Sequence, residues 1–119
     1  MISVLIKSAK KFGLKENLVR LWAKKALKKY YLDNCELSLI FIEPKEILNL
    51  NKKYRNLNEV TSVLTFFQGQ ATPEKVFLLG DIVICPEVAE KKNLTIKFLI
   101  DHGIRNLLSE IPTTKSLRT

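Results

Sequence analysis

Apolar residues recur along this chain at two spacings, and each spacing predicts a different element. Four segments have the alternating or continuous apolar character of β-strands and are separated by turn-forming residues. These predicted strands span residues 2–6, 36–43, 61–67 and 76–85. The second of them is apolar at nearly every position, so we expect it to be covered on both faces of a sheet.

Three other segments show the 3.6-residue repeat of amphipathic helices. The first spans residues 15–31, the second starts at Pro44 and continues through 45–54, and the third begins at Pro86 and is ended by Pro112. The first helix is expected to bury one apolar stripe and to expose lysines on its other side. The stripe consists of Leu18, Val19, Trp22, Ala23, Ala26, Leu27 and Tyr30.

The order of these elements is strand, helix, strand, helix, two strands and helix. It predicts an α+β fold, in which a small mixed β-sheet of about four strands carries helices mainly on one face. A chain of 119 residues is long enough for one hydrophobic core. We therefore expect a single domain over residues 1–111, followed by a frayed polar tail over 112–119.

Composition narrows the class of protein further. With 46% apolar and 27% charged residues, the chain is typical of a soluble globular protein. No apolar segment is long enough to cross a bilayer, and no signal-peptide pattern appears, so we expect a cytoplasmic protein. Cys35 and Cys85 have no metal-binding spacing, and reduced thiols are favoured over a disulfide between them.

The net charge of +8 is unevenly distributed. Residues 1–30 contain nine Lys and Arg against one acid, Glu16, whereas the rest of the chain is balanced. A concentrated positive face suits a polyanion such as RNA, which is bound through its phosphates. On charge alone, a solvated helix face that keeps the protein soluble is the commoner explanation.

Four motifs occur in order between residues 50 and 108. They are Leu50-Asn51-Lys52-Lys53-Tyr54-Arg55, Thr61-Ser62-Val63-Leu64-Thr65-Phe66, Leu79-Gly80-Asp81-Ile82-Val83-Ile84-Cys85 and the region that begins at His102-Gly103. Together they resemble the YbeY family of bacterial rRNA maturation factors, whose members are metal-dependent endoribonucleases. The resemblance implies the YbeY-like α+β fold and single-stranded RNA as the substrate.

In that family the last motif reads His-Gly-x-Leu-His-Leu-x-Gly-x-Asp-His, and its three histidines hold a zinc ion. At these positions the present chain has His102, Asn106 and Pro112. Bound zinc lowers the pKa of a water molecule toward neutrality and so supplies the nucleophile for phosphodiester cleavage. An amide oxygen is a weak zinc ligand and proline has no side-chain donor. The metal motif is therefore degenerate or truncated, and we expect reduced zinc binding and reduced or no activity.

Neighbouring carboxylates do not replace the missing histidines. Asp101 points about 100° away from His102 around the helix, and Glu110 lies about two turns farther along it. His102 remains the one candidate metal ligand, with a catalytic role implied by the resemblance. The alternative is a partly buried histidine bonded to the backbone or to water.

The resemblance also gives roles to residues outside the metal motif. Arg55 is the candidate for gripping an RNA phosphate, because a guanidinium pairs two oxygens and stays charged. A structural salt bridge from Arg55 to Asp81 or Glu59 explains it equally well. Asp81 could orient Arg55 or a histidine. The candidate RNA-binding residues are Lys24, Lys25, Lys28, Lys29 and Arg55.

Three functions remain open at this stage. The first is an endoribonuclease that acts in 16S rRNA processing and ribosome quality control, with ribosomal RNA and the small ribosomal subunit as partners. The second is a non-catalytic RNA- or ribosome-binding remnant, and the third is a metallohydrolase with another substrate. A glutamate directly after His102 would favour a metalloprotease, but Gly103 stands there. The sequence does not indicate an oligomeric state.

Overall fold

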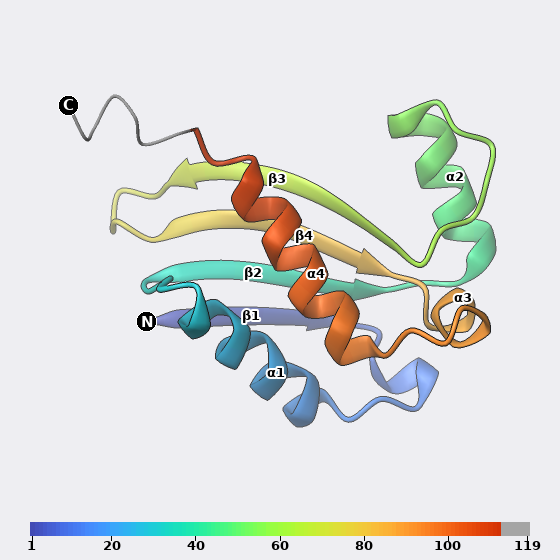
Figure 1. Cartoon of the computed structure of the whole chain (residues 1–119). Helices are drawn as coiled ribbons and strands as arrows, with labels where there is room; N and C mark the ends of the chain where they lie inside the picture. Colours follow the sequence, from blue (N-terminus) through green and yellow to red (C-terminus); the bar gives the residue numbers. More distant parts are fainter. Residues whose placement is uncertain (113–119) are drawn as a thin grey trace.

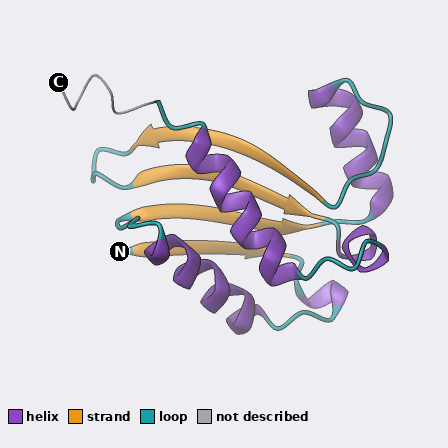
Figure 2. Ribbon diagram, viewed as in Figure 1, coloured by secondary structure: helices purple, strands orange, loops and turns teal. Residues whose placement is uncertain are grey.

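The computed structural model describes residues 1–112 and contains four strands, four α-helices and one short 3-10 helix (Figures 1 and 2). In chain order these are β1 (Ile2–Lys7), η1 (Lys10–Phe12), α1 (Glu16–Lys29), β2 (Cys35–Phe41), α2 (Pro44–Arg55), β3 (Val63–Ala71), β4 (Phe77–Ile84), α3 (Pro86–Lys91) and α4 (Ile96–Ser109). The predicted tail over 112–119 lies outside the described residues except for Pro112.

The four strands form one mixed sheet in the spatial order β1-β2-β4-β3. β1 and β4 both pair with β2 in the parallel direction, whereas β3 pairs with β4 in the antiparallel direction. The predicted α+β fold with a small mixed sheet is thus confirmed. β4 is a central strand, and the two edges of the sheet are β1 and β3.

Helices α1 and α4 cross the same face of the sheet (Figure 1). The main core lies beneath them, because alternate side chains of each strand point toward this face, with one irregularity in β4 at Leu79. Its strand residues include Val4, Leu37, Leu39, Phe41, Leu79, Ile82 and Ile84. In α1 the buried residues are Val19, Ala23, Ala26 and Leu27. Leu18 was predicted to join this stripe but is 41% exposed, because it points outward from the helix.

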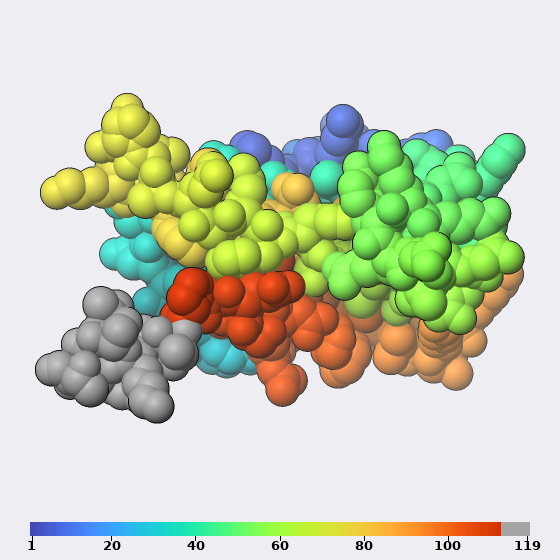
Figure 3. Space-filling model, turned by 90° about the horizontal axis from the view of Figure 1, so that it is seen from above, coloured from blue at the N-terminus to red at the C-terminus, as the bar shows by residue number. Residues whose placement is uncertain are grey.

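The opposite face of the sheet is covered only at one end, where α2 packs on a smaller apolar cluster. Its buried members are Ile42, Ile47, Leu64, Val83, Cys85 and Val88. Seen from above, edge strand β3 lies between α2 and α4 (Figure 3). The expectation that 36–43 is covered on both faces is therefore only partly met: β2 alternates between fully buried and half-buried positions.

The start of α2 follows from local chemistry. Pro44 occupies the first turn as predicted, and Glu43 and Glu46 form a reciprocal capping box with each other's backbone N–H. The helix ends at Asn56, whose φ of 55° is left-handed. Asn51, only 2% exposed, donates from its side-chain amide to the Glu59 carbonyl at 3.0 Å and so holds the loop that follows.

The predicted helix from Pro86 to Pro112 is in fact two helices, α3 and α4. Asn93 has a left-handed φ of 56°, which ends α3. The Thr95 hydroxyl then accepts a hydrogen bond from the Phe98 N–H at 3.0 Å and caps the start of α4. Leu94 and Ile96 pack on the core and continue the apolar repeat between the two helices. The apolar pattern therefore gave no sign of the break between α3 and α4.

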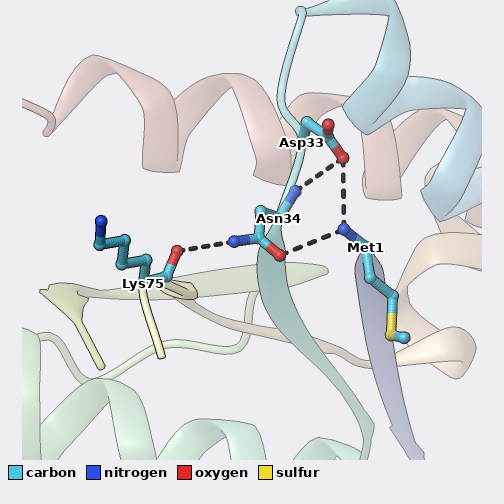
Figure 4. Close-up of polar contacts among 4 residues, drawn as sticks. All are labelled: Met1, Asp33, Asn34 and Lys75. Atoms are coloured by element: carbon cyan, nitrogen blue, oxygen red, sulfur yellow. Dashed lines mark hydrogen bonds and ion pairs between the residues drawn. The ribbon is translucent and has the colours of Figure 1, made fainter. Parts of the chain in front are cut away.

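Polar contacts close one end of the sheet (Figure 4). The Met1 ammonium lies 3.4 Å from the Asp33 carboxylate and donates to the Asn34 side-chain oxygen at 3.1 Å. Asn34 also donates from its amide to the Lys75 carbonyl at 2.8 Å. The turn before β2 thus joins the start of β1 to the β3–β4 hairpin. The backbone N–H of Asn34, together with the Met1 ammonium, lowers the pKa of Asp33.

None of the helices in residues 1–112 has the length and apolarity needed to cross a membrane.

The position of α4 depends on two glycines. A Cβ atom at position 103 would lie 2.8 Å from two carbons of the Ile82 side chain, so the helix can approach β4 this closely only with glycine there. Gly80 has a φ of 147°, and a Cβ on it would meet the Phe66 carbonyl oxygen and lie 3.1 Å from the Leu107 side chain.

We therefore expect Gly103→Ala to destabilise the protein by about 1–3 kcal/mol, although alanine is the better helix former. Adding Ile82→Val removes one of the crowding carbons and should restore part of the loss. Urea unfolding of the single and double variants measures both effects. A Gly103→Ala protein as stable as the parent would show that α4 does not need this close approach.

Candidate functional site

His102 is half-buried on the flank of α4 that faces away from α1. Its ring stacks on that of Phe98, one turn earlier, with centroids 5.8 Å apart and planes inclined by 14°. Phe98 is itself 50% exposed, so the pair forms an aromatic surface beside the helix. Because α4 packs on β3 and β4 while α1 packs on β1, this flank points toward the β3 edge of the sheet.

Asp101 faces the other way and is committed to α1. Its carboxylate accepts from the Lys29 ammonium at 2.7 Å and from the Tyr30 hydroxyl at 3.1 and 3.2 Å. Partial burial alone would raise the pKa of Asp101, but the bonds from Lys29 and Tyr30 outweigh it and lower that pKa. The bond to Asp101 raises the pKa of Lys29 in return. Asp101 is therefore directed at α1 and not at the flank that carries His102.

Positions 106 and 112, where further metal ligands are expected to accompany His102, carry no strong metal-binding side chain. Asn106, one turn after His102, is exposed, and its carbonyl accepts from the Ser109 hydroxyl at 2.6 Å. Pro112 is exposed beyond the end of α4. Among residues 1–112, no three His, Cys, Asp or Glu side chains come together as a metal site. The donors present therefore do not fit a zinc ion held by protein ligands.

Arg55, the last residue of α2, reaches edge strand β3. Its guanidinium donates to the Thr65 carbonyl at 2.7 Å, and its central carbon lies 5.8 Å from the centre of the Phe66 ring. The alternative of a salt bridge to Asp81 or Glu59 is not found within the described residues. Arg55 is exposed and keeps donors available for an anion.

Asp81 was expected to orient Arg55 or a histidine, and the structure places it away from His102. It lies on the sheet face opposite α4, in a groove that also contains Tyr54 and Phe66. The reason is strand alternation, because Gly80 and Ile82 point toward α4 and the residue between them must point away. The expected contacts from Asp81 to Arg55 and to His102 are absent from the described residues.

The four candidate lysines of α1 are not equivalent. Lys25 and Lys28 are exposed and Lys24 is half-buried, whereas Lys29 is held by Asp101. An RNA phosphate would meet the first three without breaking a contact within the protein. Lys29 contributes charge but also joins α1 to α4.

Sequence reasoning missed the aromatic pair on α2 and β3. The rings of Tyr54 and Phe66 meet edge to face at 5.4 Å, and the Lys53 ammonium lies 5.2 Å from the Tyr54 ring centre. Alternation in 61–67 could have placed Phe66 on the face of Leu64, but nothing in the pattern showed that α2 covers that face.

A family model and two related proteins that match this chain carry the same description. A family model described as Endoribonuclease YbeY matches residues 5–108. Endoribonuclease YbeY of Aquifex aeolicus is 36% identical over 113 residues, covering 88% of this chain and 74% of that protein. Its counterpart in Staphylococcus epidermidis is 35% identical over 91 residues, covering 64% of this chain and 59% of that protein.

A solution structure from Thermotoga maritima has a similar fold. Its TM-score is 0.54 at 27% sequence identity, and the match covers 98% of this chain and 78% of that one.

The contact between Asp101 and α1 gives a pH-dependent prediction. Because the folded state lowers the pKa of Asp101 and raises that of Lys29, the stabilisation from their pairing is complete between about pH 4 and pH 10. It is lost progressively as the pH falls below or rises above that range. Asp101→Asn should therefore lower the melting temperature by a few degrees at pH 7 and have a smaller effect as the pH falls below about pH 4. Glu90→Gln, which removes an exposed carboxylate from α3, is the matched control. Equal melting curves for both variants at pH 7 would contradict a stabilising role for this pair.

Proposed function

Because this chain belongs to the YbeY endoribonuclease family, we propose that it binds ribosomal RNA with a weakened or absent metal-dependent hydrolytic activity. The proposal rests on one observation about α4. One helical turn after His102, where a second strong metal ligand would lie, the chain has Asn106. The matched relatives are named endoribonucleases, so RNA is the substrate that we assign to the chain.

The impairment follows from ligand chemistry. Structural and catalytic zinc sites use at least three protein ligands drawn from histidine, cysteine and carboxylates. Here one imidazole is present, the carboxylate of the preceding residue, Asp101, is held by Lys29 and Tyr30, and Pro112 offers no donor. Zinc would supply an activated water in an intact site, but the residues of this chain do not fit it.

The RNA-binding part of the proposal needs no metal. Lys25 and Lys28 are exposed on α1, and Lys10 and Lys15 stand near the start of that helix. Arg55 adds a separate cation at the β3 edge. These groups favour binding of RNA phosphates. From the family of the chain we assign 16S rRNA or the small ribosomal subunit in the cytoplasm as the partner, with the chain acting either as a slow nuclease or as a non-catalytic binding protein.

We expect the purified 119-residue chain to contain well under one zinc ion per molecule after dialysis, because a single histidine cannot hold the metal against dilution. Elemental analysis measures the content directly. The triple variant Asn106→His, Ser109→Gly, Pro112→His should bind more zinc, whereas Asn106→His alone should gain little.

The same samples test the activity. We expect RNA cleavage by the parent to be close to background, since ordinary water is a weak nucleophile. Stoichiometric zinc in the parent, or metal-dependent cleavage that His102→Ala abolishes, would reveal a ligand set that the described residues do not contain.

RNA binding should weaken steeply as salt concentration rises, because it releases counterions from the phosphates. Lys24→Glu, Lys25→Glu and Lys28→Glu together should reduce the affinity for single-stranded RNA by at least about tenfold at low salt. Lys29 is left unchanged so that its bond to Asp101 persists. Fluorescence anisotropy with a labelled rRNA fragment is the measurement.

The control for this variant carries the same change in charge elsewhere, at the exposed residues Lys75, Lys91 and Lys92. If both variants lose the same affinity, the effect is one of net charge only. If neither loses affinity, the lysines of α1 serve solubility and do not bind RNA.

A further inference from the structure

The face of the sheet opposite α4 carries a groove that the metal motif does not explain. It has a volume of about 380 Å³ and is lined by Ile40, Ile42, Leu50, Tyr54, Phe66, Asp81 and Val83. This is within the range of small-ligand pockets, roughly 300–1,000 Å³. Apolar side chains from β2, β4 and α2 form most of its surface, with one carboxylate among them.

The strand register fixes what lies around that carboxylate. Leu5 pairs with Ser38, Ser38 with Asp81, and Asp81 with Phe66, so these four side chains form one row across all four strands. Leu5, at the far end of the row, is 51% exposed, which shows that α2 leaves this part of the sheet open. Asp81 thus lies between a small polar side chain and an aromatic ring.

The Asp81 carboxylate has no hydrogen bond or ion pair to any residue within 1–112. Its side chain is only half-buried, so a ligand can reach the two carboxylate oxygens. A ligand that brings two hydrogen-bond donors would form charge-assisted hydrogen bonds with them.

The wall of the groove combines aromatic rings with cations. Tyr54, 56% exposed, meets Phe66 edge to face, and the two rings have Lys53 and Arg55 as cationic neighbours. Exposed aromatic rings beside cations are the arrangement that holds single-stranded nucleic acids, since bases stack on the rings and phosphates meet the cations.

Building on the proposed RNA binding, we propose that this groove takes one unstacked base of single-stranded RNA and that Asp81 makes it select guanine. Guanine presents two adjacent donors, N1–H and the N2 amino group, which match the two oxygens of a carboxylate. The other bases offer a single amino or imide donor at the equivalent position. The base stacks on Tyr54, while Lys53 and Arg55 receive the flanking phosphates.

The test is a titration of the ¹⁵N-labelled chain with the hexanucleotides UUGUUU and UUAUUU, followed by NMR and by anisotropy. The guanine oligonucleotide should shift the amides of Phe66, Asp81 and Val83, and it should bind about tenfold more tightly than the adenine one. Asp81→Asn should remove this preference, because its amide replaces one acceptor by a donor. Tyr54→Leu should weaken the binding of both oligonucleotides.

Glu36→Gln is the matched control. Glu36 is half-buried, is two residues from Ser38 on the same strand and face, and does not line the groove. This variant removes the same charge from the same sheet face and should keep the preference for guanine. The parent-like NMR spectrum of each variant verifies its fold.

Other outcomes separate this inference from the proposed function. If both oligonucleotides bind equally and shift only amides of α1, RNA binding stands and the guanine site is overturned. If neither oligonucleotide binds, the proposed function fails and this inference fails with it. If an arginine-containing peptide shifts the groove amides while RNA does not, the groove is a protein-binding site and the inference is overturned.

Discussion

The close approach of α4 to β4 is the contact on which the rest of this structure depends. Gly103 lets the helix backbone lie directly on Ile82, and Gly80 lets the Leu107 side chain settle against the sheet. This packing fixes the rotation of α4 about its axis. Once the rotation is fixed, Asp101 must meet α1 and His102 must point toward the β3 edge, since consecutive helical residues diverge by about 100°.

The sheet then separates two kinds of chemistry. The side beneath α1 and α4 contains most of the core, and His102 lies at its margin. The opposite side has little helical cover and holds Asp81 with the aromatic pair of Tyr54 and Phe66. Arg55 stands at the edge strand near the boundary between these sides, bound to a β3 carbonyl. Functions that depend on His102 and functions that depend on the open groove are therefore separable by mutation.

Local patterns predicted the elements well where a single residue type decides the geometry. Pro44 and Pro86 each start a helix as expected, and alternation correctly identified the strands. The break before α4 was missed, because apolar residues at 94 and 96 continue the repeat and only Asn93 and Thr95 mark the interruption. Leu18 was misplaced because an apolar residue at the margin of a helical stripe need not face the core.

The site was less predictable, since its contacts join distant segments. The motif positions identified His102 and Arg55, but the bond from Arg55 goes to a backbone carbonyl, which no side-chain pattern records. The face on which Asp81 lies follows from its neighbours Gly80 and Ile82 only after the direction of α4 is known.

The strand order has a consequence for how the chain folds. β1 and β2 pair after a helical crossover, and β4 must then insert between β2 and β3, although β3 precedes it in the chain. During synthesis, one edge of β2 therefore stays without its partner until residue 84 has been made. The short β3–β4 hairpin is the only strand pairing between consecutive strands in residues 1–112 that needs no helical crossover. Local hairpin closure followed by docking onto β2 is the route with the smallest loss of chain entropy.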